Sequence, residues 1–170
     1  MVAPSQVANP ASQIQLNDLQ FTGSTKIKLY VDLFYVNGLC FLYTKSKDIN
    51  FNTIQHLPNW HNFKLLKTLK HVISKYMTCQ FTITDIFANN EFDHDDLHHV
   101  ALPANLYIYF AQGEHIPIIK HSICIVKDQS RAIYQGLPYL HFPKLMTISL
   151  LKSIEWWLNI LPTFKNSTFS

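Results

Sequence analysis

The chain has 170 residues, 48% of them hydrophobic and 14% aromatic, which is enough for one sizeable core. Only 15% are charged and the formal net charge is +3, a mild basic excess that permits nucleic-acid contact without establishing it. No apolar run is as long as the stretch of about 18 residues that a membrane-spanning helix needs. The widely spaced Cys40, Cys79 and Cys124 form neither a disulfide framework nor a C-x-x-C metal knuckle. We therefore expect a soluble, intracellular protein, nuclear or cytoplasmic, that is not secreted and contacts no membrane.

The N-terminal stretch differs in composition from the rest. Residues 1–24 are rich in Pro, Ser, Gln and Asn, and they lack the basic segment and apolar core of a secretory signal. We expect a flexible lead-in over 1–24, one domain over 25–165 and a short tail over 166–170.

The first predicted strand contains an acidic residue. Asp32 stands in the run 29–36, which is rich in β-branched and aromatic side chains, and a charge there costs free energy unless a metal or partner compensates it. The turn dipeptide Asn37-Gly38 and the apolar run 39–44 complete a predicted hairpin. Asp32 is therefore a candidate site residue, and the alternative is an edge-strand aspartate that faces water.

Further strands and helices are predicted after the hairpin from the change of hydrophobic period. The predicted strands are 49–54, 80–87 and 105–110, and the predicted helices are 62–77, 117–135 and 143–161. In the strand 80–87, Phe81, Ile83 and Asp85 are expected on one face. The apolar face of the first helix is expected to contain Phe63, Leu66, Leu69, Ile73, Tyr76 and Met77. This order of elements predicts an α/β fold.

Two surface features of the helices have competing explanations. Adjacent helical residues point about 100° apart, so we expect Trp157 in the core stripe of the last helix and Trp156 at its border, with a protein interface as the alternative. The lysines of the first helix are interpreted as a solvated face, with contacts to phosphate as the alternative. They are Lys64, Lys67, Lys70 and Lys75.

Acids and histidines gather in the polar run 89–99. On a helix His94 and His98 share a face at the i, i+4 spacing of transition-metal ligands, and Asp95 pairs with His99 in the same way. A zinc site needs three or four ligands, and the sequence specifies no third strong one. We therefore favour a solvated helix start whose acids lie near the positive end of the helix dipole. The full cluster is Asp93, His94, Asp95, Asp96, His98 and His99.

Several separated blocks resemble one family in their order along the chain. They are VDLFYVNGLCFLYTKS…INFNTIQHLPN, FTITDIFANNEFD, GEHIPIIKHSICIVKDQSRAIYQGLPY and WLNILP, within residues 27–165. They resemble the integrase catalytic core of copia-type retrotransposons. The resemblance implies the ribonuclease-H-like fold of the retroviral integrase superfamily. The order of elements is consistent with it and predicts a mixed five-stranded sheet with helices on both faces and strand 29–36 at its centre. The resemblance also implies DNA integration by polynucleotidyl transfer, with DNA as the partner, homo-oligomers, and three carboxylates that hold two Mg²⁺ or Mn²⁺ ions.

One of the three family carboxylates is retained in this chain. The first matches Asp32. The second belongs to a motif resembling DNEFE and matches Asn89, whose amide keeps an oxygen but no charge. The third, a glutamate in a segment resembling EIERSIRTIKER, matches Lys120, whose ammonium cannot ligate a cation. We therefore expect a catalytically degenerate core that binds no metal, in which Asn89 and Lys120 approach Asp32 and Lys120 forms an ion pair with it.

Two further hypotheses remain open. In one, the chain is an active enzyme whose metal site is rebuilt from Asp32, Asp85 or Glu91, and Glu114, although a one-residue slip in a strand already reverses the face of a side chain. In the other, the chain is a noncatalytic domain that binds nucleic acid or protein through the same scaffold.

Overall fold

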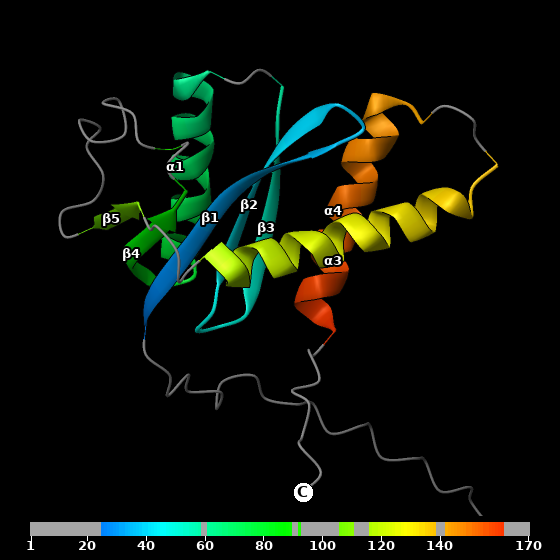
Figure 1. The fold of residues 1–170 in the computed structure, drawn as a ribbon. Helices are drawn as coiled ribbons and strands as arrows, with labels where there is room; N and C mark the ends of the chain where they lie inside the picture. The colour runs from blue at the N-terminus through cyan, green and yellow to red at the C-terminus, as the bar shows by residue number, and fades with distance from the viewer. Residues whose placement is uncertain are drawn as a thin grey trace, which may run out of the picture.

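The computed structural model of the protein describes residues 25–58, 61–89, 92, 106–110, 116–138 and 142–161. The predicted lead-in and tail and the cluster from Asp93 to His99 lie outside these ranges. Within them, helices cover a five-stranded sheet (Figure 1). No helix in the described part of the chain is both long and apolar enough to cross a membrane.

The sheet has the predicted mixed topology. Its strands are β1 (Lys26–Val36), β2 (Leu39–Ser46), β3 (Phe51–Leu57), β4 (Thr82–Ala88) and β5 (Tyr107–Phe110), in the spatial order β3-β2-β1-β4-β5. β1, β2 and β3 pair antiparallel, whereas β4 runs parallel to β1 and β5 runs parallel to β4. Because β1 is central, Asp32 does not lie on an edge strand.

The turn between β1 and β2 confirms the predicted hairpin. Val36 pairs with Leu39, which leaves a two-residue turn in which Asn37 and Gly38 have φ of 49° and 74°. Asn and Gly are the residues that tolerate this left-handed conformation best. β4 begins at Thr82, two residues later than predicted, because Gln80 has φ of 66° in the turn that follows the first helix.

The helices lie on both faces of the sheet, as predicted. α1 (Asn62–Thr78) packs on one face, against β3 and β4. α3 (Ile116–Gln135) and α4 (Lys144–Ile160) pack on the other, where α3 crosses β1 and β2 and α4 lies along β3 (Figure 1). Each face therefore has its own core.

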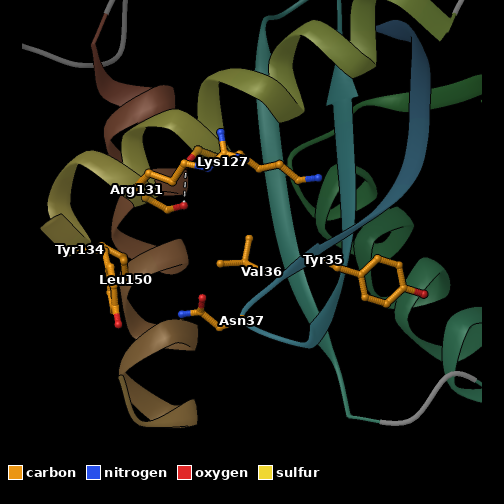
Figure 2. Close-up of a pocket in the computed structure, with 8 residues that line it drawn as sticks. Tyr35, Val36, Asn37, Lys127, Arg131, Tyr134 and Leu150 are labelled. Carbon is orange, nitrogen blue, oxygen red and sulfur yellow. Dashed lines mark hydrogen bonds between the residues drawn. The ribbon is translucent and has the colours of Figure 1, made fainter. Parts of the chain in front are cut away.

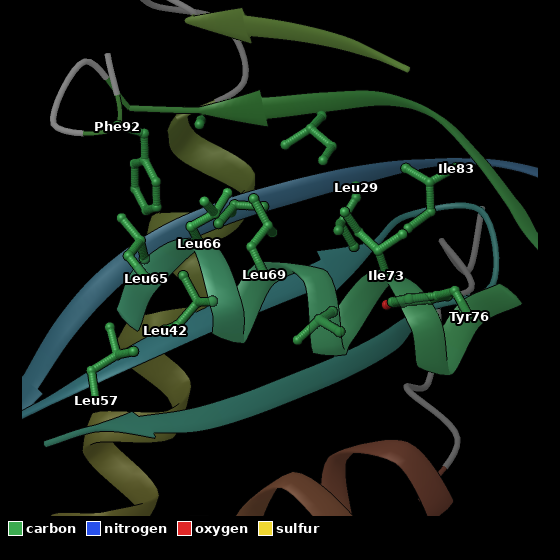
Figure 3. Close-up of a cluster of buried hydrophobic side chains, with 14 of the residues drawn as sticks. Leu29, Leu42, Leu57, Leu65, Leu66, Leu69, Ile73, Tyr76, Ile83 and Phe92 are labelled. Carbon is green, nitrogen blue, oxygen red and sulfur yellow. The ribbon is translucent and has the colours of Figure 1, made fainter. Parts of the chain in front are cut away.

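The core under α1 is mainly aliphatic (Figure 3). The predicted apolar face of α1 is wrong at its ends, since Phe63 is 70% exposed and Met77 is 54% exposed. At 100° per residue, these two side chains lie about 120° and 80° around the helix from Leu69, outside the buried stripe. The residues that α1 buries are Leu65, Leu66, Leu69, Val72, Ile73 and Tyr76.

The core under α3 and α4 is richer in aromatic residues. On α4 the buried stripe contains Thr147, Leu151 and Ile154, whereas Trp156 and Trp157 are 55% and 49% exposed. The prediction that Trp157 lies in the core is therefore wrong. The Trp157 side chain projects about 90° around the helix from the centre of the buried stripe. The face of α4 that packs against β3 is the one with Thr147, Leu151 and Ile154.

Candidate functional site

Asp32 lies on the face of the sheet that α3 and α4 cover. Side chains alternate along β1, and Asp32 shares its face with Tyr30 and Phe34, which belong to the core under those helices. Its side chain is only 8% exposed, and Oδ1 accepts a hydrogen bond of 2.8 Å from the backbone N–H of Leu33. The carboxylate is thus held at the centre of the sheet.

Asn89 emerges beside Asp32. In the parallel pair of β1 and β4, Val31 is opposite Ala88. The next residues along the two strands are Asp32 after Val31 and Asn89 after Ala88. Asn89 is half-buried, and its carbonyl oxygen accepts a 2.9 Å hydrogen bond from the N–H of Phe92. The strand register therefore brings these two predicted positions together.

A β-bulge sets the face on which these side chains lie. Ile27 pairs with Ile83 but the next residue, Lys28, pairs with Asp85, so Thr84 is an extra residue in β4. Ile83 and Ile86 are three residues apart, so in a regular strand their side chains would point to opposite faces. Both belong to the core under α1, and the alternation of side chains along β4 is therefore reversed at the bulge. Asp85 therefore faces the side opposite Ile83, and the prediction that they share a face is wrong.

The rebuilt metal site does not form from Asp85. Asp85 is opposite Lys28, four residues before Asp32 on β1, and four residues of strand span about 13 Å. Two catalytic metal ions lie only about 3.5 to 4 Å apart, so carboxylates at that separation do not bridge them. Glu91 and Glu114 lie outside the described residues, and within the described ranges no three His, Cys, Asp or Glu side chains cluster to hold a metal.

Lys120 lies in the second turn of α3, on the same side of the sheet as Asp32. Its side chain is exposed, whereas the neighbouring Ile119, Ser122 and Ile123 are buried toward the sheet. In the part of the chain that the structure describes, no ion pair joins Lys120 to Asp32, so that predicted contact is not made. One anionic, one neutral and one cationic group do not fit two divalent metal ions.

A layer of polar contacts beside Asp32 holds α3 and α4 on the sheet. Tyr43 is directly opposite Asp32, and its hydroxyl donates a 2.7 Å hydrogen bond to Oδ1 of Asn52. Burial raises the pKa of Tyr43 above its usual value of 10.0. The backbone N–H of Asn52 donates to Oδ1 of Asn159 on α4 at 2.8 Å. The contact of Asn52 with Asn159 joins residues 107 positions apart, too distant in sequence for any local pattern to predict it.

Lys45 makes the corresponding link to α3. Its ammonium donates a 2.9 Å hydrogen bond to the hydroxyl of Ser122, and burial lowers the pKa of Lys45 below its usual value of 10.5. Ser122 in turn donates to the backbone carbonyl of Ile118 at 3.1 Å. Asp32 thus shares its face of the sheet with a partly desolvated cation.

A cavity of about 200 Å³ lies at the end of β1, where α3 passes the hairpin turn. Figure 2 shows Lys127 and Arg131 projecting from α3 near Val36 and Asn37. Arg131 forms an exposed ion pair of 2.8 Å with Asp128. The cavity offers cationic and amide donors, which suit an anion. Its complete lining is Tyr35, Val36, Asn37, Lys127, Ser130, Arg131, Tyr134 and Leu150.

Comparison with known proteins identifies the fold. No protein-family model and no curated protein matches the chain. The catalytic core domain of BIV integrase superposes with a TM-score of 0.62 at 9% identity, over 80% of this chain and 85% of that chain. The HTLV-2 integrase catalytic core domain, solved with magnesium in a trimeric form, gives a TM-score of 0.60 at 11% identity, over 84% and 89%. The chain therefore has the ribonuclease-H-like fold of integrase catalytic cores, as the sequence resemblance implied.

Proposed function

We propose that the chain is an integrase core derived from a copia-type retrotransposon, which binds DNA but has lost two-metal chemistry. The observation that carries the proposal is the charge at three positions on one side of the sheet. Asp32 keeps its carboxylate, but Asn89 beside it is neutral and Lys120 on α3 is cationic.

The change of charge has a large expected consequence. In a two-metal site, carboxylates hold two divalent ions that activate the attacking oxygen and stabilise the leaving oxygen of a phosphodiester. Here the formal charges of the three groups cancel, so the donor set lacks the negative charge that hard cations require. Each loss of about 1.4 kcal/mol of transition-state stabilisation lowers the reaction rate tenfold, so a loss of several kcal/mol lowers it by orders of magnitude.

DNA as partner is supported by cations near the site. Lys127 and Arg131 lie on α3 beside the end of β1, and Val36 in the same cavity is four residues after Asp32. Lys120 is exposed nearer the start of the same helix. Such side chains neutralise phosphates and release counterions, which gives binding that falls with salt.

The first test is metal-dependent cleavage of a labelled DNA duplex, in Mg²⁺ and in Mn²⁺. We expect no end-processing and no strand transfer by the unmodified chain, and the same result for Asp32→Asn. Cleavage by the unmodified chain that disappears in Asp32→Asn would overturn the loss of catalysis.

The second test measures duplex binding by fluorescence anisotropy. The variant Lys127→Ala/Arg131→Ala should bind more weakly and with a shallower salt dependence. Lys64→Ala/Lys67→Ala on α1 removes the same charge from the opposite side of the sheet and should bind as the unmodified chain does. Equal effects of the two double variants would mean that binding reflects net charge alone.

A protein-binding role is the second candidate, favoured by the outer face of α4. Trp156, Trp157, Ile160 and Leu161 are each about half exposed, and the two indole rings meet edge to face with centroids 4.8 Å apart. Aromatic residues are enriched in protein interfaces. If this face mediates self-association, light scattering should detect an oligomer that Trp156→Ala/Trp157→Ala converts to a monomer. A monomeric unmodified chain would exclude a homo-oligomer at the concentrations tested.

A further inference from the structure

Three aromatic rings form a stack across the sheet, one row away from Asp32. Tyr30 on β1 is opposite Phe87 on β4, which is opposite Tyr109 on β5. The Tyr30 and Phe87 ring centroids are 5.2 Å apart with planes at 20°, and those of Phe87 and Tyr109 are 5.2 Å apart with planes at 17°. The rings are therefore nearly parallel along the whole stack.

The stack leads from the core to an exposed ring. Tyr30 is 5% exposed and belongs to the core that α3 covers, whereas Tyr109 is 46% exposed. β5 is the last strand in the sheet order, so no described strand continues the stack beyond Tyr109. Ile108 and Phe110 pack on the core under α1, and alternation along β5 therefore directs Tyr107 and Tyr109 to the face of Asp32. Tyr107 is 61% exposed.

Two lysines and two acids lie beside the inner end of the stack, at Tyr30. Lys28 is exposed on the same face two residues before Tyr30, and Lys45 is directly opposite Tyr30. The two acids are Asp85, opposite Lys28 on β4, and Asp48, whose Oδ2 accepts a 2.7 Å hydrogen bond from the backbone N–H of Lys28. The row of rings lies two residues before Asp32 and Asn89, which is about 7 Å along the strands. Across the sheet, the outer end of the stack is one strand beyond Asn89 and two strands beyond Asp32, at about 4.8 Å per strand, so a base stacked there lies to one side of the candidate site.

We propose that Tyr109, backed by Phe87 and Tyr30, stacks on an unpaired base of a DNA strand whose duplex part occupies the candidate site. This inference rests on the proposed DNA-binding function and adds a preference for duplexes with a single-stranded end. Stacking of a base on an aromatic ring tolerates any sequence, because every base has a π-face.

The test compares a blunt duplex with the same duplex carrying a short 3′ thymidine overhang, by fluorescence anisotropy. The unmodified chain should bind the overhang duplex more tightly. Tyr109→Ala should weaken binding to the overhang duplex about fivefold or more, the loss of one base–aromatic stack, and leave blunt-duplex binding unchanged. Tyr109→Phe keeps the ring and should bind both DNAs as the unmodified chain does.

The controls separate this inference from the function on which it rests. Phe63→Ala removes an exposed ring from α1, on the other side of the sheet, and should change neither affinity. Failure of the unmodified chain to bind either DNA overturns the proposed function. Binding to both DNAs with equal affinity, or a preference that survives in Tyr109→Ala, overturns only the stacking role. If Tyr109→Ala has lost its circular-dichroism melting transition, Tyr109→Leu replaces it with the same expected loss.

Discussion

The face of the sheet under α1 and the face under α3 and α4 are made by the same strands but bury different chemistry. Under α1 the core contains aliphatic residues such as Leu29 and Leu42, with no charged side chain among its described members (Figure 3). Under α3 and α4 the alternate residues of β1 and β2 include Asp32 and Lys45. Strand alternation thus lets one face supply stability while the other accommodates a charged site.

This division has an energetic reason. Apolar burial contributes about 25 cal/mol per Å², whereas a buried charge costs free energy unless other groups compensate it. Asp32 is 8% exposed and is the charged residue most deeply buried among those described. A domain that buries such a group needs the mainly apolar core on its other face, where the buried hydroxyls of Thr44 and Thr53 hydrogen-bond each other.

The largest change is expected from making all three candidate positions acidic. Asn89→Asp with Lys120→Glu changes the formal charge of the three positions from zero to minus three, so Mn²⁺ affinity should rise by orders of magnitude. Isothermal titration calorimetry measures it. Either substitution alone should have little effect, because both metals share ligands. A double variant that binds no Mn²⁺ would contradict the assignment of these positions to one site.

The next largest effect is on the α1 face. Leu42 is 0% exposed in that core, so Leu42→Ala should lower the free energy of unfolding by about 2 to 5 kcal/mol. Leu145→Ala, at a site 77% exposed on α4, is the matched control and should cost less than about 0.5 kcal/mol. Urea denaturation compares the two. Equal losses would mean that the described core does not dominate stability.

Alkaline pH should destabilise both faces through one buried tyrosine on each. Burial raises the pKa of Tyr43 and of Tyr76 above the usual 10.0, so above pH 10 the unfolded chain loses protons that the folded chain retains. Stability therefore falls as pH rises, by about 1.4 kcal/mol per pH unit for each tyrosine. Tyr76→Phe and Tyr43→Phe should each reduce the slope of the free energy of unfolding against pH by about 1.4 kcal/mol per pH unit. Urea denaturation at several pH values above 10 measures this slope.

Lys45 adds an effect of opposite sign in a lower pH range. Its lowered pKa means that the unfolded chain binds more protons just below pH 10.5, so its contribution to stability rises with pH there. Lys45→Met should remove this rise and leave the slope above pH 10.5, which the tyrosines set, unchanged. A rise of the same size in Lys45→Met, measured by urea denaturation at several pH values below 10.5, would contradict the burial of the ammonium.

The smallest effect on stability is expected at the cavity beside β1. The Arg131 and Asp128 side chains of the ion pair are 67% and 71% exposed, and pairs of this kind contribute about 0 to 1 kcal/mol. Arg131→Ala should leave the urea midpoint nearly unchanged while it weakens duplex binding. A large loss of stability would instead assign Arg131 a structural role.

Several elements were predictable because their signals are local. The Asn37-Gly38 turn requires a left-handed backbone that these residues favour, and the apolar period identified all three described helices to within one or two residues at each end. The order of elements, taken with the resemblance, predicted a central position for strand 29–36, which periodicity alone does not specify. Trp157 and Phe63 were predicted to be buried but are exposed. Helical spacing identifies an apolar stripe, but it does not specify which residues within that stripe contact the sheet.

By itself, the sequence determined the hairpin, the helices, the position of Asp32 on a strand, and the neutral and cationic side chains of Asn89 and Lys120. Only the tertiary structure decided that the extra residue Thr84 reverses the faces of β4, separates Asp85 from Asp32 and aligns Phe87 with Tyr30 and Tyr109. The reason is physical: turn and helix preferences act between near neighbours, whereas a bulge and a cross-strand row depend on the pairing register of distant strands.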